Sequence, residues 1–274
     1  MLRIITHKGG AHADDFLAVA FLLGRLGPMV SVERRDPTEE ELNDSSCFVV
    51  DVGGRHEPEL NNYDHHQFDR DHEPTCAFSL VLQAFGLYDD FVAAFPWLKA
   101  IEKMDSKGPF VCAADLGVDA NNLMPYLLSP MADYMLTRFQ RNNELKKLEI
   151  DLLYDFGQHL FTQLNELRKR WDEIESVTAG GIEEIDGIKV FIADVKGFTG
   201  IDSYMSRKGI EANAVFVNDD RDDGFALRRE NDDPRIDFSK VDGQKGVRFA
   251  HANGFVCKVD SETDCFEILR NSLA

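Results

Sequence analysis

The sequence lacks the features of an extracellular or membrane protein. Its five cysteines are odd in number, widely spaced and free of any CxxC pair, a pattern that predicts reduced thiols rather than a disulfide framework. No run approaches the ~18 apolar residues that a membrane helix requires, and no signal peptide is visible after Met1. We therefore expect a cytoplasmic protein that does not enter a membrane.

Positive charge is also scarce. The chain has 30 Lys and Arg residues against 49 Asp and Glu residues, which gives a formal net charge of −19. A field of this sign repels phosphate backbones and argues against a protein that coats long nucleic acid. It remains compatible with a small phosphate-bearing substrate, because bound metal cations can invert the local field.

The length of 274 residues, with 43% hydrophobic residues, allows one large or two modest domains. The first half alternates between strand-like and helix-like segments, namely 2–6, 14–26, 29–34, 37–42 and 47–51. This alternation is typical of an α/β fold with a parallel sheet. Further helices are predicted over 75–85 and 89–104.

A long amphipathic helix is predicted in the middle of the chain. Apolar residues follow one another at steps of three and four from Leu145 to Trp171, which indicates a helix with a core-facing stripe. Beyond it lie strand-like runs at 188–193, 214–218, 225–229 and 255–259, with a helix over 201–208. We place a boundary near Ala179, so the predicted domains are 1–178, including the connecting helix, and a smaller α/β domain over 179–274.

Titratable side chains gather at four places, each at the end of a predicted strand or helix. They are the loop with His7, His12, Asp14 and Asp15; Asp51 after an apolar strand; the run Asp64-His65-His66; and Asp105 at a helix end. In open α/β sheets, ligands bind at the carboxyl ends of the strands. Imidazoles and carboxylates together suit Mn²⁺, Mg²⁺, Fe²⁺ or Zn²⁺, and the lack of a thiolate argues against structural zinc.

The number of these side chains favours two ions over one. Two ions about 3.5–4 Å apart that share a carboxylate account for the set better than a single ion does. Asp51 is the natural bridge, because its strand lies between the other clusters. Each cluster alone also has a structural interpretation: His7 as a hydrogen-bonded loop residue, Asp14-Asp15 as a helix start, and Asp105 as a turn residue.

The order of these clusters resembles the DHH phosphoesterase superfamily, and most closely its melanocyte-proliferating-gene family of metal-dependent nucleases. The resemblance is carried by residues 6–15, 50–54 and 63–67, and by the late segment 247–255, which is similar to that family's closing His-Ala-x-Gly-Phe stretch. The sequence departs from the superfamily where His12 replaces the first of two usual aspartates. It departs again where Phe249-Ala250 replaces a Gly-Gly pair.

The resemblance implies roles for individual residues. The metal ligands would be His7, His12, Asp14, Asp51, His65 and Asp105, holding two Mn²⁺ ions, or Mg²⁺ or another divalent cation. For catalysis, His66 would face the scissile phosphate and Asp64 would orient a neighbouring imidazole. Asp15 is left open between a metal ligand and a helix cap.

In the second domain, the predicted substrate-binding residues are Arg228, Arg229, His251, Asn253 and Gly254. Arginine offers a planar fork suited to phosphate, although surface salt bridges explain the Arg pair equally well. The predicted function is a metal-dependent phosphoesterase, a 3'-5' exonuclease acting on a short oligonucleotide or nucleotide-like phosphoester. The alternatives are a small-molecule phosphatase or pyrophosphatase and a non-catalytic metal-binding regulator, and a homodimer is left open.

Overall fold

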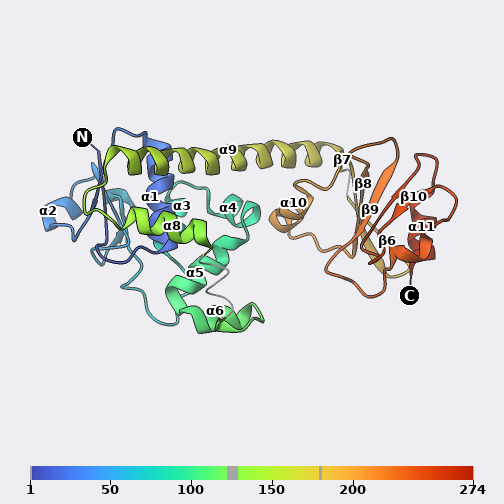
Figure 1. The fold of residues 1–274 in the computed structure, drawn as a ribbon, viewed down its shortest axis with the longest axis horizontal. Helices are drawn as coiled ribbons and strands as arrows, with labels where there is room; N and C mark the ends of the chain where they lie inside the picture. Colours follow the sequence, from blue (N-terminus) through green and yellow to red (C-terminus); the bar gives the residue numbers. More distant parts are fainter. Residues whose placement is uncertain (1, 122–128, 179–180, 274) are drawn as a thin grey trace. The chain divides into compact units, whose positions relative to one another are not determined.

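The computed structural model describes residues 2–121, 129–178 and 181–273 (Figure 1). The chain forms two compact units, Met1–Asn165 and Glu166–Ala274. Their boundary lies inside the long helix α9 (Lys147–Val177), a helix that the sequence assigns whole to the first domain. Ala179, the predicted boundary, lies outside the described residues.

The first unit is built on a largely parallel sheet, which confirms the predicted α/β class. Its strands are β1 (Arg3–Thr6), β2 (Ser31–Arg34), β3 (Cys47–Val50), β4 (His56–Glu57) and β5 (Asn62–Tyr63), in the order β2-β1-β3-β5-β4. β1 pairs in parallel with β2 and β3, and β3 pairs in parallel with β5. β4 is antiparallel to β5. All four residues of β3 are buried, as expected of a central strand.

Helices make up the rest of this unit. They are α1 (Ala13–Leu26), α2 (Glu39–Leu42), α3 (Ala77–Ala84), α4 (Tyr88–Ala94), α5 (Trp97–Lys107), α6 (Pro109–Asp115) and α8 (Pro130–Phe139). The single helix predicted over 89–104 is in fact two, α4 and α5. Pro96 separates them, because a proline disfavours the helical conformation of the residue before it.

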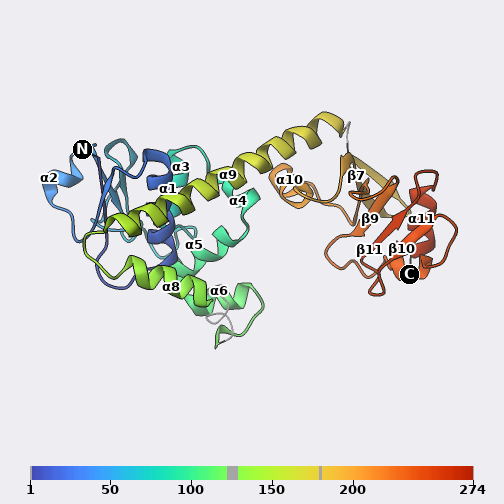
Figure 2. The same cartoon turned by 45° about the horizontal axis from the view of Figure 1, so that its top comes forward.

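Helices α1 and α9 lie side by side, as both views show (Figures 1 and 2). Two glycines make this approach possible. A Cβ on Gly157 of α9 would lie 2.0 Å from the carbonyl oxygen of Ala20, and a Cβ on Gly24 would lie 2.8 Å from the carbonyl carbon of Gly157. The Gln158 side chain adds a hydrogen bond to the Gly24 carbonyl at 2.5 Å. The two backbones are therefore in direct contact.

The Gly157→Ala substitution should destabilise the first unit. An interior helical Gly→Ala change ordinarily stabilises a helix by about 1 kcal/mol, but here the new methyl group would force α1 and α9 apart. We expect a net loss of about 1–3 kcal/mol in the free energy of unfolding, measured by urea denaturation. Gly10→Ala is the matched control, since nothing lies within 4 Å of a Cβ at that position. A more stable Gly157→Ala protein would contradict the close approach.

The second unit is a mixed α/β unit with a six-stranded sheet of order β10-β11-β9-β8-β7-β6. Its strands are β6 (Ile182–Ile185), β7 (Ile188–Lys196), β8 (Ala214–Asn218), β9 (Phe225–Arg229), β10 (Val247–Ala250) and β11 (Val256–Val259). β7 and β8 are parallel, and the other neighbours are antiparallel. Helix α10 (Ile201–Lys208) forms where it was predicted. Helix α11 (Cys265–Ser272) buries Ile268 and Leu269 in the same core as Leu227 of the sheet.

Two features bear on the sequence-based expectations. Among the described helices, none is both long and apolar enough to cross a membrane. The five cysteines are free thiols; four are buried and Cys265 is half-buried.

Candidate metal centre

The sheet brings the first two clusters together. β1 and β3 are parallel neighbours, and Thr6 pairs with Val50 at their carboxyl ends. His7 follows Thr6 and Asp51 follows Val50, so both side chains emerge at the same edge of the sheet. The loop after His7 then reaches Ala13, where α1 begins.

Asp51 lies at the centre of the cluster. Its Oδ2 lies 3.4 Å from Nε2 of His7, whereas its Oδ1 lies 3.2 Å from Nε2 of His65 and 3.6 Å from Nδ1 of His66. Its backbone adopts a left-handed conformation with φ 59°, which Asp tolerates better than most residues. The two oxygens of one carboxylate therefore face imidazoles from two different segments.

Asp105 and Asp14 complete the cluster. Oδ2 of Asp105, from α5, lies 2.8 Å from Nε2 of His65, and its Oδ1 lies 3.7 Å from Nδ1 of His12. Asp14 is buried, and its Oδ2 accepts a hydrogen bond from the backbone N–H of Ala77 at the start of α3, at 3.3 Å. The structure thus brings all six predicted ligands to one place.

Three groups of these side chains have ligand atoms within 4.8 Å of one another. The groups are His7, His12 and Asp51; Asp51, His65 and His66; and Asp14, Asp51, His65 and Asp105. Asp51 is common to all three. His66, which the sequence assigns to the phosphate, is therefore also within reach of a cation.

Unpartnered buried atoms show that the cluster suits a cation. Within the described residues, His7 Nε2, His65 Nε2, Asp14 Oδ1 and Asp51 Oδ1 are buried and lack a partner in hydrogen-bond geometry. A carboxylate oxygen nevertheless lies within 3.4 Å of each of these two nitrogens. Buried polar atoms without partners are costly. Divalent cations coordinated by these atoms would remove that cost.

The protonation of the cluster leads to the same conclusion. Burial, together with the nearby Asp51 and Asp105 charges, raises the pKa of Asp14 well above its ordinary value. Burial also raises the pKa of Asp51. Contact with Asp15 raises the pKa of His7 to about 9. For His65, burial acts in the opposite direction, but the close carboxylates of Asp105 and Asp51 raise the pKa to about 10. Without a metal ion, the cluster therefore holds protons that a divalent cation would displace.

Asp15 divides its two oxygens between the two roles left open by the sequence. Oδ1 accepts hydrogen bonds from the backbone N–H groups of His12 at 2.8 Å and Phe16 at 2.9 Å, which is the helix-capping role. Oδ2 faces the cluster, 3.0 Å from Nε2 of His7 and 3.5 Å from Arg34. Asp15 thereby ties the start of α1 to the candidate metal ligands.

The sequence did not predict that Arg34 belongs to the site. Its side chain is 1% exposed, and it donates hydrogen bonds to the carbonyl oxygens of His7 at 3.0 Å and Gly9 at 3.3 Å. These contacts fix the loop that carries His7. Its position at the end of β2, where it pairs with Thr6 in the parallel sheet, could have indicated that it lies near His7.

Asp64 holds the His66 imidazole. Oδ1 of Asp64 accepts a hydrogen bond from the backbone N–H of His66 at 3.0 Å and lies 2.7 Å from Nδ1 of its ring, while Oδ2 accepts from the Gly54 N–H at 2.6 Å. Although burial opposes it, the bonds from His66 keep the pKa of Asp64 below its ordinary value, and the same contact raises the pKa of His66. The His66 side chain itself is exposed. This geometry suits an oriented, solvent-facing imidazole.

The predicted arginines lie in the second unit, and both are engaged. Arg228 forms ion pairs with Asp202 and Glu230, the latter at 2.7 Å. Arg229 donates to the Ile236 carbonyl at 3.0 Å and pairs with Asp232 at 3.0 Å. The two side chains have different neighbours, in keeping with alternate directions along β9. Their role toward a substrate stays a prediction.

The remaining predicted substrate residues form the turn between β10 and β11. The His251 ring centroid lies 4.1 Å from that of Phe255, and Nδ1 of His251 accepts a hydrogen bond from the Asn253 N–H at 3.1 Å. Gly254 has φ 68°, and a Cβ there would lie 2.0 Å from Asp237 Oδ1. Asn253 is exposed and His251 half-buried, so this turn presents polar groups to solvent.

Comparison with known proteins places the strongest similarity in the first unit. Residues 3–106 match the family MYG1_exonuc, described as an uncharacterised protein family (UPF0160). The matched segment contains all six predicted metal ligands. The proteins named MYG1 exonuclease from Mus musculus and Homo sapiens are each 49% identical to this chain over 70 residues. The MYG1 protein of Schizosaccharomyces pombe is 36% identical over 89 residues.

These matches are partial. The mammalian alignments cover 24% of this chain and 17% of each relative, and the yeast alignment covers 32% of this chain and 26% of the relative. Among solved structures, a pGpG-specific phosphodiesterase, PggH of Vibrio cholerae, aligns with 95% of this chain and 94% of its own, at 12% identity and a TM-score of 0.33. A score this low does not establish a shared fold.

Proposed function

We propose that this chain belongs to the MYG1 family within the DHH phosphoesterase superfamily and hydrolyses phosphodiester bonds with the help of two divalent cations, Mn²⁺ above all. The observation that carries the proposal is Asp51, whose two oxygens face His7 on one side and His65 on the other. The exonuclease name of the mammalian relatives supports the reaction class. The finer proposal is a 3'-5' exonuclease acting on short nucleic acid.

His7 and His12 would hold one side of the centre, His65 and Asp105 the other, and Asp51 would bridge them. The sequence pairs Asp14 with His7 and His12, but its ligand atom groups with those of His65 and Asp105, so Asp14 would serve that second side. Divalent cations bound there would activate water near neutral pH and offset the charge that develops on the phosphoryl oxygens. Asp64 accepts the Nδ1–H of His66 and favours the protonated imidazolium, whose Nε2–H can then donate a hydrogen bond to a nonbridging phosphate oxygen. Arg34 and Asp15 keep the His7 loop in position, so the ligands need little rearrangement.

In this proposal residues 1–178 are the catalytic domain and residues 179–274 bind the substrate. The substrate groups would contact Arg228 or Arg229, His251, Asn253 and Gly254. Because both guanidinium groups are already ion-paired, an incoming phosphate has to replace Asp202 or Asp232 as partner. A cytoplasmic location belongs to the same proposal, and the oligomeric state is left open.

A substrate panel tests the reaction class. A phosphodiester dinucleotide, inorganic pyrophosphate and a mononucleotide are incubated with the protein and Mn²⁺, and released phosphate or nucleotide is measured. The proposal expects turnover of the dinucleotide. Turnover of pyrophosphate or the mononucleotide alone would indicate a phosphatase, and binding of Mn²⁺ with no turnover of any of the three would indicate a regulator.

We expect short substrates to be cleaved faster than long single strands. The chain carries a net charge of −19. In its richest basic stretch, 168–170, Arg170 pairs with Glu173 and donates a hydrogen bond to the Thr199 carbonyl. Only the metal centre and one or two basic side chains would then attract phosphates, which suits substrates of about two to five nucleotides.

Rates measured against oligonucleotide length at two salt concentrations check this prediction. For one or two neutralised phosphates, log kcat/KM should fall with log salt with a slope no steeper than about −1.5. Steep salt dependence together with a preference for long strands would contradict it.

A further inference from the structure

A cavity of about 690 Å³ in the first unit shares a wall with the candidate metal centre. His12, Asp14 and Asp105 belong to its lining, and every other described residue of the lining is apolar. The apolar part includes Ile101 and Met104 from α5, Met131, Met135 and Leu136 from α8, and Phe156 from α9. A volume of this size is typical of small-molecule sites. The cavity therefore combines an apolar interior with metal ligands at one side.

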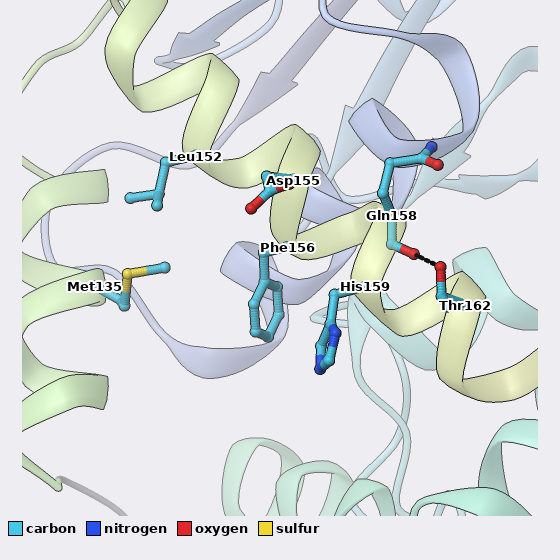
Figure 3. A pocket seen from close by; sticks show the side chains of 7 residues that line it. All are labelled: Met135, Leu152, Asp155, Phe156, Gln158, His159 and Thr162. Atoms are coloured by element: carbon cyan, nitrogen blue, oxygen red, sulfur yellow. Dashed lines mark hydrogen bonds between the residues drawn. The ribbon is translucent and has the colours of Figure 1, made fainter.

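A second, smaller cavity continues the same region between α8 and α9. It has a volume of about 410 Å³ and shares Met135 and Phe156 with the first cavity. Figure 3 shows these two side chains reaching it from different helices, with Leu152 and His159 on the same side of α9. Met135 and Phe156 are thus accessible from both cavities, so neither is part of a closed core.

We propose that the larger cavity binds the nucleobase of a nucleotide whose phosphate lies at the metal centre. The inference rests on the proposed function and specifies its substrate class. An occupant that suits this cavity has an apolar body that packs against Met135 and Phe156. It also has an anionic group that reaches the cations proposed to bind at His12 and Asp105. A nucleotide joins both parts in one molecule. The planar face of a base stacks well on an aromatic ring or a methionine sulfur.

The same lining predicts little discrimination between bases. Beyond the three candidate metal ligands, the described lining offers no polar side chain that could read the hydrogen-bonding edge of a base. Discrimination between bases depends on such polar groups, whereas stacking is available to every base. We expect all four bases to be accepted with similar affinity.

The test compares AMP with ribose 5-phosphate, two probes that differ only in the base. Each is titrated calorimetrically into the Mn²⁺-loaded protein. Stacking of the base should make AMP bind about 5- to 100-fold more tightly than ribose 5-phosphate. CMP, GMP and UMP should fall within a few-fold of AMP.

Variants on α8 assign the preference to the cavity. Ala132, a half-buried residue of the lining, is replaced in Ala132→Phe, whose ring should obstruct the part of the cavity beside α8 and weaken or remove the AMP preference while ribose 5-phosphate binds as before. Met131→Ala, at an exposed side chain of the lining, gives a second and structurally milder variant that should weaken the preference. Tyr134→Ala is the control, since Tyr134 is exposed on α8 and is outside the described lining.

The outcomes separate the two proposals. Dinucleotide hydrolysis with equal affinities for AMP and ribose 5-phosphate, or an AMP preference that survives Ala132→Phe, would overturn the base site alone. Failure of both probes to bind, with no hydrolysis of a dinucleotide, would overturn the proposed function and the base site with it.

Discussion

Asp51→Asn should remove metal binding and hydrolysis together, without unfolding the protein. The substitution takes away a negative charge that faces His7 and His65 through its two oxygens. Replacing a residue that only supports a metal ligand lowers the metal affinity about 10–100-fold. A carboxylate shared by two ions should cost more, so we expect a loss of more than about 100-fold in metal affinity and in kcat/KM.

The folded state should tolerate this change. Asn, like Asp, tolerates the left-handed backbone conformation that residue 51 adopts. Burial raises the pKa of Asp51, which means that its ionised form opposes folding at neutral pH. The metal-free Asp51→Asn protein should therefore melt at the same or a higher temperature than the metal-free parent.

Metal analysis after equilibrium dialysis, together with thermal melting in chelator, measures both effects. Asp69→Asn, at an exposed carboxylate outside the cluster, changes the net charge equally and should keep full metal content. Asp105→Asn should lose mainly one ion, since Asp105 contacts His65 and His12 but lies outside the group of His7, His12 and Asp51. Two ions per chain in Asp51→Asn would show that the bridge is misassigned.

The candidate site could be predicted because chain order alone determines much of it. A parallel sheet places the residues after β1 and β3 at one edge, so His7 and Asp51 had to be neighbours once the α/β alternation was recognised. The remaining ligands follow in the order that the superfamily resemblance implies. What chain order does not determine is the role of each oxygen, and Asp15 illustrates this by capping α1 with one oxygen and facing His7 with the other.

The periodicity of α9 predicted a helix but not its partners. Leu160, Leu164 and Trp171 of the predicted stripe are buried, whereas Leu148 is 65% exposed and Leu152 is 37% exposed. Spacing identifies which face of a helix is apolar, but contacts from the rest of the fold decide how much of that face is covered. Leu152 instead lines the cavity beside Met135.

Elements with weak or mixed patterns escaped prediction. Strand β6 reads Ile-Glu-Glu-Ile and β10 reads Val-Arg-Phe-Ala, and both lie at the edges of their sheet, where burial imposes no clean alternation. The short helices α6 and α8 were also missed. Because α8 supplies several of the side chains that line the apolar cavity, the cavity could not be predicted from the sequence.

Removal of divalent cations should abolish hydrolysis and lower the melting temperature of the protein. The cluster gathers four carboxylates, Asp14, Asp15, Asp51 and Asp105, and burial with mutual repulsion raises the pKa of Asp14 in the absence of an ion. Each cation present at 100 times its dissociation constant stabilises the folded state by about 2.7 kcal/mol. For a unit of this size that corresponds to a rise of roughly 5–11 °C in melting temperature.

The experiment follows activity and melting temperature after exhaustive chelation and after each metal is added back. Mn²⁺ should restore both most effectively, because imidazole and carboxylate ligands together suit it better than they suit Mg²⁺. The same additions should leave the melting temperature of Asp51→Asn nearly unchanged, which separates specific binding from general effects of salt on an acidic protein. Undiminished hydrolysis by the chelated protein would refute a metal-dependent mechanism. A rise in melting temperature that persists in Asp51→Asn would place the cations elsewhere.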